Sequence, residues 1–371
     1  MKFFVALLLR NIFLAISLFF PIQKKIFFVS YSGKKFTCNP YVIYSELIKS
    51  KKYACIVVDN NVKGNEAIDK TSFVINKSIS YFYHYLTAKI LITNDSFPVF
   101  LPKLRNQILI NTWHGGGAYK KVDPTSKIQA LLYNLLYKDT DYFISSNSIF
   151  TQVISKALNL NEGKFLNIGM PRNDILFDRS KVSFISNRVR KKLLLNNEIV
   201  VLYAPTWRDD GREILENLAD KEILEAVKKR FKGQVRFLIR AHYHTKNIQS
   251  EGFIDVSSYP DMQELLCAAD ILITDYSSCM WDFSLMYKPC FIYATDIAKY
   301  EQERDFYIPM SEWPFPIATN NKELVNNITN FDEAEYIEKV KQHHKALGSY
   351  EDGHATERVC KLIEKICSGE D

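Results

Sequence analysis

Short apolar runs alternate with stretches of helical periodicity along this chain, and the alternation occurs twice. The first series of predicted strands covers residues 26–30, 53–59, 73–76, 90–94, 107–111, 142–145 and 165–169. The second series covers residues 199–204, 235–240, 253–255, 271–274 and 290–293. Strands that alternate with helices indicate βαβ units and mainly parallel sheets, which bind ligands outside the carboxyl ends of their strands. The pattern therefore predicts two α/β halves in tandem with a central cleft.

The length of the chain supports this division, because 371 residues are many for a single core. Predicted helices cover residues 41–49 and 78–86 in the first half, and 215–231, 261–268, 278–286, 322–328, 333–344 and 355–367 in the second. The polar run 178–190 is interpreted as a connector. We therefore expect one domain at residues 25–177 and another at 190–371, preceded by a separate segment at 1–24.

Residues 3–22 are almost wholly apolar, interrupted by Arg10, Asn11 and Ser17. A signal peptide, a transmembrane helix, an interfacial helix and a buried core helix are the alternatives. No small-residue cleavage site follows, which argues against a signal peptide. A spanning helix would place Arg10 near mid-bilayer at a cost of about 2.5–3.5 kcal/mol. Arg10 and Ser17 share a helix face, as an in-plane helix requires.

The charges around this segment favour a lipid surface. Six basic residues precede the first acidic one, Glu46: Lys2, Arg10, Lys24, Lys25, Lys34 and Lys35. Such a basic margin is attracted to anionic lipid on the cytoplasmic leaflet. We expect residues 1–24 to form a helix that attaches peripherally to the cytoplasmic face of the cell membrane, with a core helix or a true span as alternatives.

The overall charge argues against nucleic-acid binding, and the cysteines argue against a disulfide-bonded protein. A net charge of +6 is small and dispersed, so nucleic acid is not an expected partner. The cysteines are odd in number, lack C-x-x-C spacing and partly lie in apolar runs: Cys38, Cys55, Cys267, Cys279, Cys290, Cys360 and Cys367. This pattern predicts buried, reduced thiols in a cytosolic protein.

The predicted strand 107–111 is followed by Thr-Trp-His-Gly-Gly-Gly at residues 112–117, with the histidine at position 114. The glycines, including Gly115 and Gly116, let the backbone approach a ligand closely, and their amides can cradle an anion. His114 is the side-chain type best suited to proton transfer near neutral pH. A capping or core histidine is the alternative interpretation.

Three strand ends in the second half carry groups suited to phosphate. Thr206 and Arg208 follow the strand 199–204, although Arg208 could instead pair with a neighbouring aspartate. Arg240 and His242 are two residues apart, so both face one side of an extended chain, where they could stabilise a diphosphate. His244 completes an H-x-H pair, but without a third ligand at suitable spacing a metal is not expected.

The third strand end, 271–274, is followed by Asp275 and then by Ser277 and Ser278. The serines open a predicted helix, where hydroxyls and free amides can bind an anion or simply form an N-cap. The chain has no P-loop, dinucleotide fingerprint, nucleophile elbow or H-E-x-x-H motif. The pair His343-His344 lies late in a charged helix and is expected to be solvated.

Taken together, these motifs resemble the CDP-glycerol:polyol-phosphate glycerophosphotransferase family of teichoic acid primases and polymerases. The resemblance spans roughly residues 26–365 and rests on residues 112–115, 120–121, 169–174, 204–208, 240–242, 255–261, 274–278, 288–289 and 352–358. One departure stands out. The family usually has Trp-His-Gly-Thr-Pro-Leu-Lys-Lys, whereas residues 113–121 here are Trp-His-Gly-Gly-Gly-Ala-Tyr-Lys-Lys.

The resemblance implies a GT-B fold, with a Rossmann-like acceptor domain at 25–177 and a Rossmann-like CDP-donor domain at 190–371. It implies transfer of polyol phosphate from CDP-glycerol or CDP-ribitol to a lipid-linked acceptor, with release of CMP, for cell-wall teichoic acid or a teichoic-like capsule. It implies no cofactor and no metal. A GT-B glycosyltransferase that uses a nucleotide sugar for surface polysaccharide and a non-enzymatic membrane adaptor are the alternatives.

The resemblance also assigns roles. His114 would be the base that activates the acceptor hydroxyl, and Arg240 with His242 would stabilise the diphosphate and the departing CMP. Asp275 would accept a polyol or ribose hydroxyl. The remaining assignments are diphosphate binding by Ser277, Ser278, Thr206 and Arg208, and acceptor-side contacts by Gly115, Gly116, Lys120 and Lys121.

Overall fold

The computed structural model describes residues 2–60, 67–68, 70–117, 119–206, 220–240 and 253–369. The chain forms two compact units. The first comprises Met1–His114, Val122–Asp174 and Tyr350–Asp371, and the second comprises Gly115–Lys121 and Ile175–Ser349. The chain therefore passes into the second unit directly after His114, returns for residues 122–174, and returns again at Tyr350.

The first unit is built on an eight-stranded sheet in the order β3-β4-β2-β1-β5-β6-β7-β8. Its strands are β1 Gln23–Val29, β2 Ala54–Val58, β3 Ala67–Ile68, β4 Thr71–Val74, β5 Ala88–Thr93, β6 Ile108–Asn111, β7 Tyr142–Ser145 and β8 Phe165–Asn167. All neighbouring strands pair in parallel except β3 and β4. The central strands are buried on both faces, which explains their near-continuous apolar sequence.

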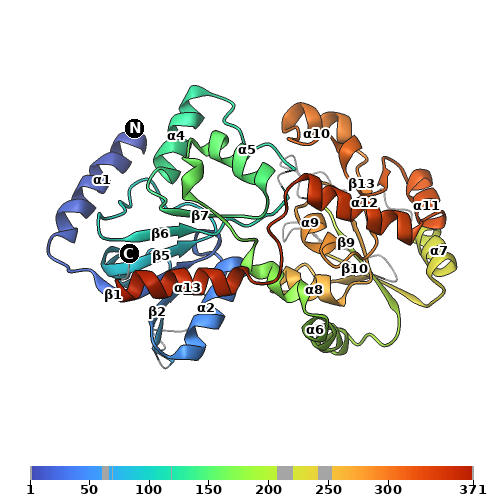
Figure 1. Ribbon diagram of the computed structural model, residues 1–371, viewed down its shortest axis with the longest axis horizontal. Helices are drawn as coiled ribbons and strands as arrows, with labels where there is room; N and C mark the ends of the chain where they lie inside the picture. The colour runs from blue at the N-terminus through green and yellow to red at the C-terminus, as the bar shows by residue number, and fades with distance from the viewer. Residues whose placement is uncertain are drawn as a thin grey trace. The chain divides into compact units, whose positions relative to one another are not determined.

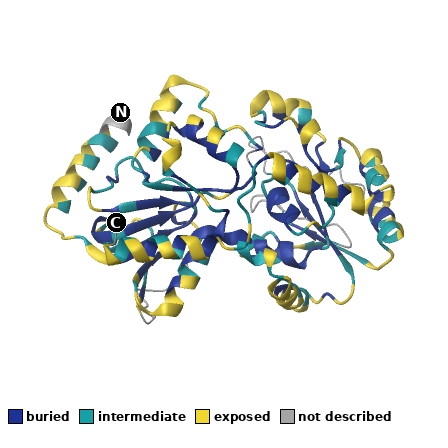
Figure 2. Cartoon of the chain, in the orientation of Figure 1, coloured by how far each residue is buried: buried dark blue, intermediate teal, exposed yellow. Residues whose placement is uncertain are grey.

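The helices of the first unit are α1 Lys2–Ser17, α2 Cys38–Leu47, α3 Ile79–Thr87, α4 Lys127–Tyr137, α5 Ser148–Leu158 and α13 Ala355–Ser368, with short 3-10 turns at Tyr31–Gly33, Ile48–Ser50, Glu162–Lys164 and Pro171–Phe177. Figure 1 shows α13, in red, lying against α2 within this unit. In Figure 2 the strands are mostly buried whereas the outer faces of the helices are exposed.

The second unit is built on a parallel six-stranded sheet in the order β11-β10-β9-β12-β13-β14. Its strands are β9 Ile199–Ala204, β10 Val235–Ile239, β11 Phe253–Asp255, β12 Ile271–Thr274, β13 Cys290–Tyr293 and β14 Ile317–Ala318. Its helices are α6 Arg179–Lys192, α7 Asp220–Phe231, α8 Met262–Ala268, α9 Cys279–Ser284, α10 Ile297–Glu303, α11 Asn321–Thr329 and α12 Glu333–Ala346, with a 3-10 turn at Met310–Glu312.

Both sheets reverse their strand order near the centre. In the first unit the order reverses between β1 and β5, and in the second between β9 and β12. Such a switch point leaves a crevice at the carboxyl ends of the strands, where α/β proteins bind ligands. Asn94 follows β5, and Thr206 and Asp275 follow β9 and β12.

The expected connector at residues 178–190 is wrong, because this run forms most of α6. Asp178 caps the helix by accepting hydrogen bonds from the amides of Ser180 and Lys181 at 3.0 and 3.1 Å. Ile185 and Val189 are buried one turn apart, while the other residues make the run look polar. Amphipathic helices with a narrow apolar stripe are easily mistaken for linkers.

The domain boundaries also differ from those expected at the carboxyl end. Tyr350–Asp371 belongs to the first unit rather than to the second. The Asp174 carboxylate accepts hydrogen bonds from the amides of Ala355 and Thr356 at 3.0 and 2.7 Å, and so caps α13. The seven cysteines are all free, and five of them are buried, as the sequence predicted.

The N-terminal segment forms α1. We expected Arg10 to face solvent, but its side chain contacts the protein instead. Arg10 pairs with Asp139 at 2.8 Å and donates to the carbonyl oxygens of Val99 and Leu101 at 3.1 and 3.3 Å. Phe13 packs on Phe82 with ring centroids 5.2 Å apart. Within the described part of the chain, no helix is long and apolar enough to cross a membrane.

The basic margin is correspondingly smaller than predicted. Lys25 is 5% exposed and lies 3.0 Å from Nδ1 of His84, and burial lowers the pKa of Lys25 to about 8. The positive charge of Arg10 is paired with the Asp139 carboxylate. Lys24 and Lys34 remain exposed.

Candidate active site

His114 lies just beyond β6, at the point where the chain leaves the first unit. Its Nδ1 atom is 2.7 Å from the carbonyl oxygen of Asn94, which follows the neighbouring strand β5. A carbonyl oxygen can only accept, so the hydrogen of the neutral imidazole resides on Nδ1. Nε2 consequently carries the lone pair, and the residue is exposed. The ring is therefore oriented as a general base.

The electrostatic surroundings of His114 favour the neutral ring. Although part of the His114 residue is exposed, the surrounding protein desolvates it and lowers its pKa from the ordinary value of 6.5. The nearby positive charge of Arg172 acts in the same direction. The Asn94 carbonyl and the Asp95 carboxylate oppose this effect. The Trp113 ring stacks on the imidazole with centroids 4.9 Å apart. The imidazole is thus available as a base at neutral pH.

The glycines after His114 pack against the protein itself. A Cβ on Gly116 would lie 2.3 Å from Cδ1 of Trp281, and a Cβ on Gly115 would lie 3.0 Å from Oγ of Ser278. Gly117 has a positive φ of 93°. The close approach that the sequence attributed to a ligand is therefore occupied, at Gly116, by the Trp281 indole of α9.

Lys120 and Lys121 lie on an extended segment that pairs with residues 305–307. The Tyr307 amide donates to the Tyr119 carbonyl at 2.8 Å, and the Lys121 amide donates to the Asp305 carbonyl at 3.2 Å. The Lys121 ammonium forms an ion pair with Asp305. Lys120 Nζ lies 5.8 Å from the centroid of the Tyr300 ring. Both lysines thus have protein neighbours, and Lys121 is exposed whereas Lys120 is half-buried.

The expected solvation of His343 and His344 is wrong. His343 Nε2 lies 3.0 Å from the Tyr119 hydroxyl, and His344 Nε2 lies 2.8 Å from Oγ of Ser284. Burial lowers the pKa of each histidine to about 4, so both are neutral. The His344 ring also contacts Trp281, with centroids 4.4 Å apart. The two histidines thus pack against Tyr119, which follows the glycines, and against Ser284 and Trp281 of α9.

Asp275 and Thr206 meet at the switch point of the second sheet. The Asp275 carboxylate, 1% exposed, accepts hydrogen bonds from the Thr206 amide at 2.8 Å and the Thr206 hydroxyl at 2.6 Å. It also accepts from the Tyr276 amide at 2.5 Å. The carboxylate therefore fixes Thr206, two residues beyond the end of β9, from inside the protein.

Ser277 and Ser278 follow Asp275 and are both half-buried. The Cys279 amide lies 3.4 Å from Oγ of Ser277, and Ser278 occupies the N-cap position of α9 without a side-chain capping bond. The Ser278 hydroxyl therefore does not cap α9, which was the alternative interpretation of this residue. The helix has only six residues and therefore contributes little dipole.

Arg240 follows β10, and its Nη1 donates to the Tyr259 carbonyl at 3.0 Å. Since β10, β9 and β12 are neighbours, Arg240, Thr206 and Asp275 follow three adjacent parallel strands at the same edge of the sheet. The structure therefore groups these three predicted donor-side residues with the serines. Arg208 and His242 lie outside the described residues.

A family model for CDP-Glycerol:Poly(glycerophosphate) glycerophosphotransferase matches residues 12–365. The chain belongs to this family. The resemblance inferred from the motifs is thereby confirmed, together with the predicted class of transferase. Membership in the glycerophosphotransferase family favours this function over a nucleotide-sugar glycosyltransferase or a non-enzymatic adaptor.

Individual members of the glycerophosphotransferase family cover most of this chain. The teichoic acid glycerol-phosphate transferase of Staphylococcus aureus is 32% identical over an alignment of 367 positions, which covers 93% of this chain and 94% of that protein. The teichoic acid poly(glycerol phosphate) polymerase of Staphylococcus epidermidis is 32% identical over 92% of this chain, but this match covers only 50% of the polymerase. This chain therefore spans about half the length of that polymerase.

The solved structure of the wall teichoic acid polymerase TagF superimposes with a TM-score of 0.83 at 30% identity, over 94% of this chain and 90% of that chain. A variant of TagF soaked with CDPG gives a TM-score of 0.82. The predicted GT-B-type α/β fold is thus confirmed.

Several residues around His114 were not recognised from the sequence. Asn94 fixes its tautomer, and Asn39 and Arg172 hold the backbone on either side of it. Arg172 lies in the family motif at residues 169–174, and the sequence alone does not indicate its contact with the His114 backbone. Among the described residues, no group of three His, Cys, Asp or Glu side chains is arranged to hold a metal ion.

Proposed function

We propose that this chain transfers glycerol phosphate from CDP-glycerol to a hydroxyl of a lipid-linked acceptor and releases CMP, in the synthesis of teichoic acid or a teichoic-like capsule. The observation that carries the proposal is the His114 tautomer, because the hydrogen bond from Nδ1 to the Asn94 carbonyl leaves Nε2 unprotonated and able to accept a proton. Glycerol is the preferred polyol because both curated relatives described above are glycerol-phosphate enzymes.

In the proposed reaction the acceptor hydroxyl attacks the β-phosphorus of CDP-glycerol. A new oxygen–phosphorus bond forms, and the bond between the β-phosphorus and the bridging oxygen breaks. The bridging oxygen leaves with CMP, and Nε2 of His114 receives the proton of the hydroxyl. Because phosphoryl transfer depends mainly on positioning and electrostatic stabilisation, the donor unit must neutralise the charge on the departing CMP.

We assign that task to the strand-end groups of the second unit. Arg240 and His242 would stabilise the diphosphate, and the hydroxyls of Ser277 and Ser278 would donate to it. Asp275 is buried and already accepts hydrogen bonds from Thr206 and Tyr276, so we propose that it positions Thr206 rather than contacting the polyol. Arg208, Lys120 and Lys121 retain the supporting roles that the family resemblance gives them.

The pH dependence of the rate should report the His114 base. Desolvation lowers the pKa of this imidazole, so its active neutral form predominates at neutral pH. We expect kcat to be constant near pH 7 and to fall as the pH falls through the lowered pKa of His114, with a midpoint below 6.5. A pH–rate profile with saturating CDP-glycerol measures this midpoint. An acid limb centred above the ordinary histidine value would contradict the assignment.

A donor screen tests the function itself. Purified protein is supplied with a lipid-linked acceptor and, in separate reactions, with CDP-glycerol, CDP-ribitol or UDP-linked sugars, and nucleotide release is followed. We expect acceptor-dependent CMP release from CDP-glycerol, with CDP-ribitol as the second candidate. Turnover of a nucleotide sugar while both CDP-polyols are inert would favour the glycosyltransferase alternative.

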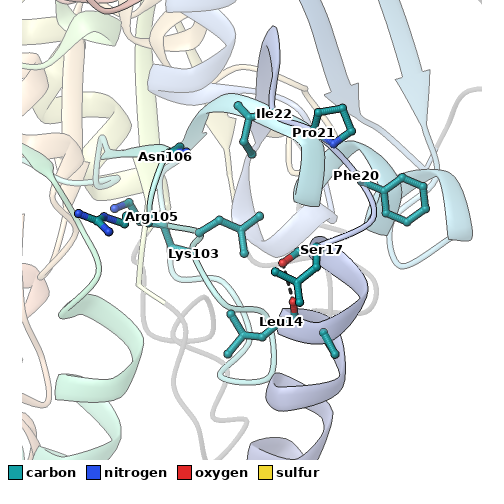
Figure 3. Close-up of a pocket in the computed structure, with 11 residues that line it drawn as sticks. Leu14, Ser17, Phe20, Pro21, Ile22, Lys103, Arg105 and Asn106 are labelled. Atoms are coloured by element: carbon teal, nitrogen blue, oxygen red, sulfur yellow. Dashed lines mark hydrogen bonds between the residues drawn. The ribbon is translucent and has the colours of Figure 1, made fainter.

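We further propose that the first unit contacts the cytoplasmic surface of the membrane through the end of α1. Leu18 and Phe19 are 85% and 82% exposed, which is unusual for adjacent large apolar residues. Beside them lies a cavity of about 560 Å³ between α1 and the loop 103–106 (Figure 3). The exposed Arg105 from this loop lines the cavity together with apolar residues such as Leu14 and Ile22. Lys103 also lines it, but its ammonium pairs with Asp141 at 3.0 Å. Apolar side chains beside cations suit anionic lipid.

This attachment predicts a vesicle-binding defect. The double variant Leu18→Asp/Phe19→Asp is expected to lose most of its co-sedimentation with phosphatidylglycerol-containing vesicles, because it replaces apolar contacts with charges that anionic lipid repels. The control is Leu194→Asp, which changes an 87% exposed leucine of the second unit. Equal vesicle binding by wild type and the double variant would exclude α1 as the membrane contact.

A further inference from the structure

The backbone that carries His114 is held in an unfavourable conformation. Trp113 has a φ of 51°, in the left-handed region that bulky side chains rarely adopt. Its amide donates to Oδ1 of Asn111 at 2.9 Å, which turns the chain sharply at the end of β6. Such a conformation persists only where surrounding contacts enforce it, and these sites cluster at functional positions.

Two buried side chains hold the three consecutive carbonyl groups of this turn. Nδ2 of Asn39 donates to the carbonyl oxygens of Thr112 and Trp113 at 2.9 and 3.0 Å. Nη1 of Arg172 donates to the carbonyl oxygen of His114 at 2.6 Å. Asn39 is fully buried and Arg172 is 7% exposed, so their hydrogen bonds do not compete with bulk solvent.

These two residues also hold each other. The Arg172 amide donates to Oδ1 of Asn39 at 2.9 Å, so the Asn39 amide group bridges two separate turns of the chain. Both of its polar atoms are used, which fixes its orientation. Movement of either residue would therefore release the other.

The turn that carries Arg172 is itself fixed by the carboxyl end of the chain. The two carboxylate oxygens of Glu351 accept from the Met170 amide and from Nδ2 of Asn173, both at 3.1 Å. Asp174 caps α13 through the amides of Ala355 and Thr356. The family motifs at residues 169–174 and 352–358 thus contact each other. The first of them also contacts the His114 backbone, through Arg172.

We propose that Asn39 and Arg172 are positioning residues that set the location and orientation of the His114 imidazole. The proposal rests on the proposed role of His114 as the base. Neither side chain needs to touch substrate, because each acts on the backbone of the turn. An imidazole displaced by about 1 Å would be poorly placed for proton transfer, and such misplacement typically costs about 100-fold in rate.

Arg172 has a second effect, through charge. Among the described residues, the charged groups that act on His114 are Arg172 and Asp95. The Trp113 ring stacks on the imidazole at a centroid distance of 4.9 Å, and the tilted Tyr31 ring lies 5.9 Å away. The guanidinium disfavours the imidazolium, whereas the Asp95 carboxylate favours it. Removing the positive charge should therefore raise the pKa of His114, and keeping the charge as lysine should restore it.

The test combines NMR titration of His114 with kinetics on Arg172→Gln, Arg172→Lys and Asn39→Ala in the full chain. The His114 signal is assigned from the spectrum of His114→Gln. For Arg172→Gln we expect a higher His114 pKa and a kcat about 10- to 100-fold lower, with little change in KM for CDP-glycerol. Arg172→Lys should restore the pKa, and Asn39→Ala should lower kcat without removing the Arg172 charge. Arg188→Gln, on the surface of α6, is the matched control.

The outcomes are distinguishable. A folded Arg172→Gln or Asn39→Ala variant with wild-type kcat and an unchanged His114 titration would overturn the positioning proposal. If Arg172→Gln does not fold, as judged by its thermal unfolding, Arg172→Lys and Asn39→Ala decide the question by the same criteria. If instead His114→Gln is fully active, the proposed base fails, while the titration still shows whether Arg172 sets the imidazole environment.

Discussion

Replacing His114 with glutamine is expected to lower kcat for CMP release from CDP-glycerol by about 10²- to 10⁴-fold, the usual contribution of a positioned general base. Glutamine is close in size to histidine and can still donate to the Asn94 carbonyl, but it has no basic nitrogen to replace Nε2. The turn around residue 114 should therefore remain folded. Initial rates with a lipid-linked acceptor, together with thermal unfolding of both proteins, measure the effect.

The matched control is His354→Gln. His354 is an exposed histidine before α13 that lies 3.3 Å from Glu357, and it has no part in the proposed chemistry. We expect its kcat to equal that of the wild type. If His114→Gln retained wild-type kcat, or if both variants lost activity equally, His114 could not be the base.

The second large effect is expected at Asp275. Changing it to asparagine removes the negative charge to which the Thr206 amide, the Thr206 hydroxyl and the Tyr276 amide donate through Oδ1. It also places an NH₂ group at the position of Oδ2, where it opposes the Thr206 amide that donates there at 3.0 Å. Hydrogen bonds to a charged group contribute about 1.5–3 kcal/mol each, and unsatisfied buried donors add to the loss. We expect the free energy of unfolding of the second unit to fall by at least this amount, and KM for CDP-glycerol to rise because Thr206 is held less firmly.

Thermal unfolding and donor saturation curves measure these two effects. Asp332→Asn is the control, since Asp332 caps α12 by accepting from the Glu335 amide at 2.9 Å, and asparagine caps helices about as well as aspartate. Its unfolding temperature should be close to that of the wild type. An Asp275→Asn variant as stable as Asp332→Asn, with unchanged KM, would contradict the structural role given to Asp275.

The strands of both sheets were largely predictable from the sequence. Buried parallel strands are short, continuous apolar runs, so β7, β9, β11, β12 and β13 have the expected limits. The helices were less predictable. Amphipathic helices such as α4 and α5 bury only part of their surface, and α6 buries two residues in a mostly polar sequence. Their apolar stripe is short and easily overlooked.

Contacts between residues distant in sequence account for most of the remaining differences. The return of α13 to the first unit depends on Asp174, about 180 residues away, and no local pattern encodes that cap. The buried positions of Lys25 and His343 likewise depend on His84 and Tyr119. At the site, residue types at strand ends suggested His114, Thr206 and Asp275 as candidates, but not the Asn39 and Arg172 contacts to the backbone.

The structure also gives a physical reason for the altered loop after His114. Gly116 passes so close to Trp281 that any Cβ would clash, and Gly117 needs a positive φ. This stretch is therefore shaped at least in part by packing on α9, in addition to any contact with the acceptor. The departure from the usual family sequence is explained without a change in the proposed chemistry.

The most direct test of that chemistry follows the fate of the β-phosphorus. CDP-glycerol radiolabelled at this phosphorus is incubated with the protein and a lipid-linked acceptor, and the nucleotide and acceptor fractions are separated. Attack at the β-phosphorus, the central claim, predicts that the label moves to the acceptor and that unlabelled CMP is released in equal amount. Label that leaves with the nucleotide as CDP would show that another bond is broken, and would contradict the proposed function.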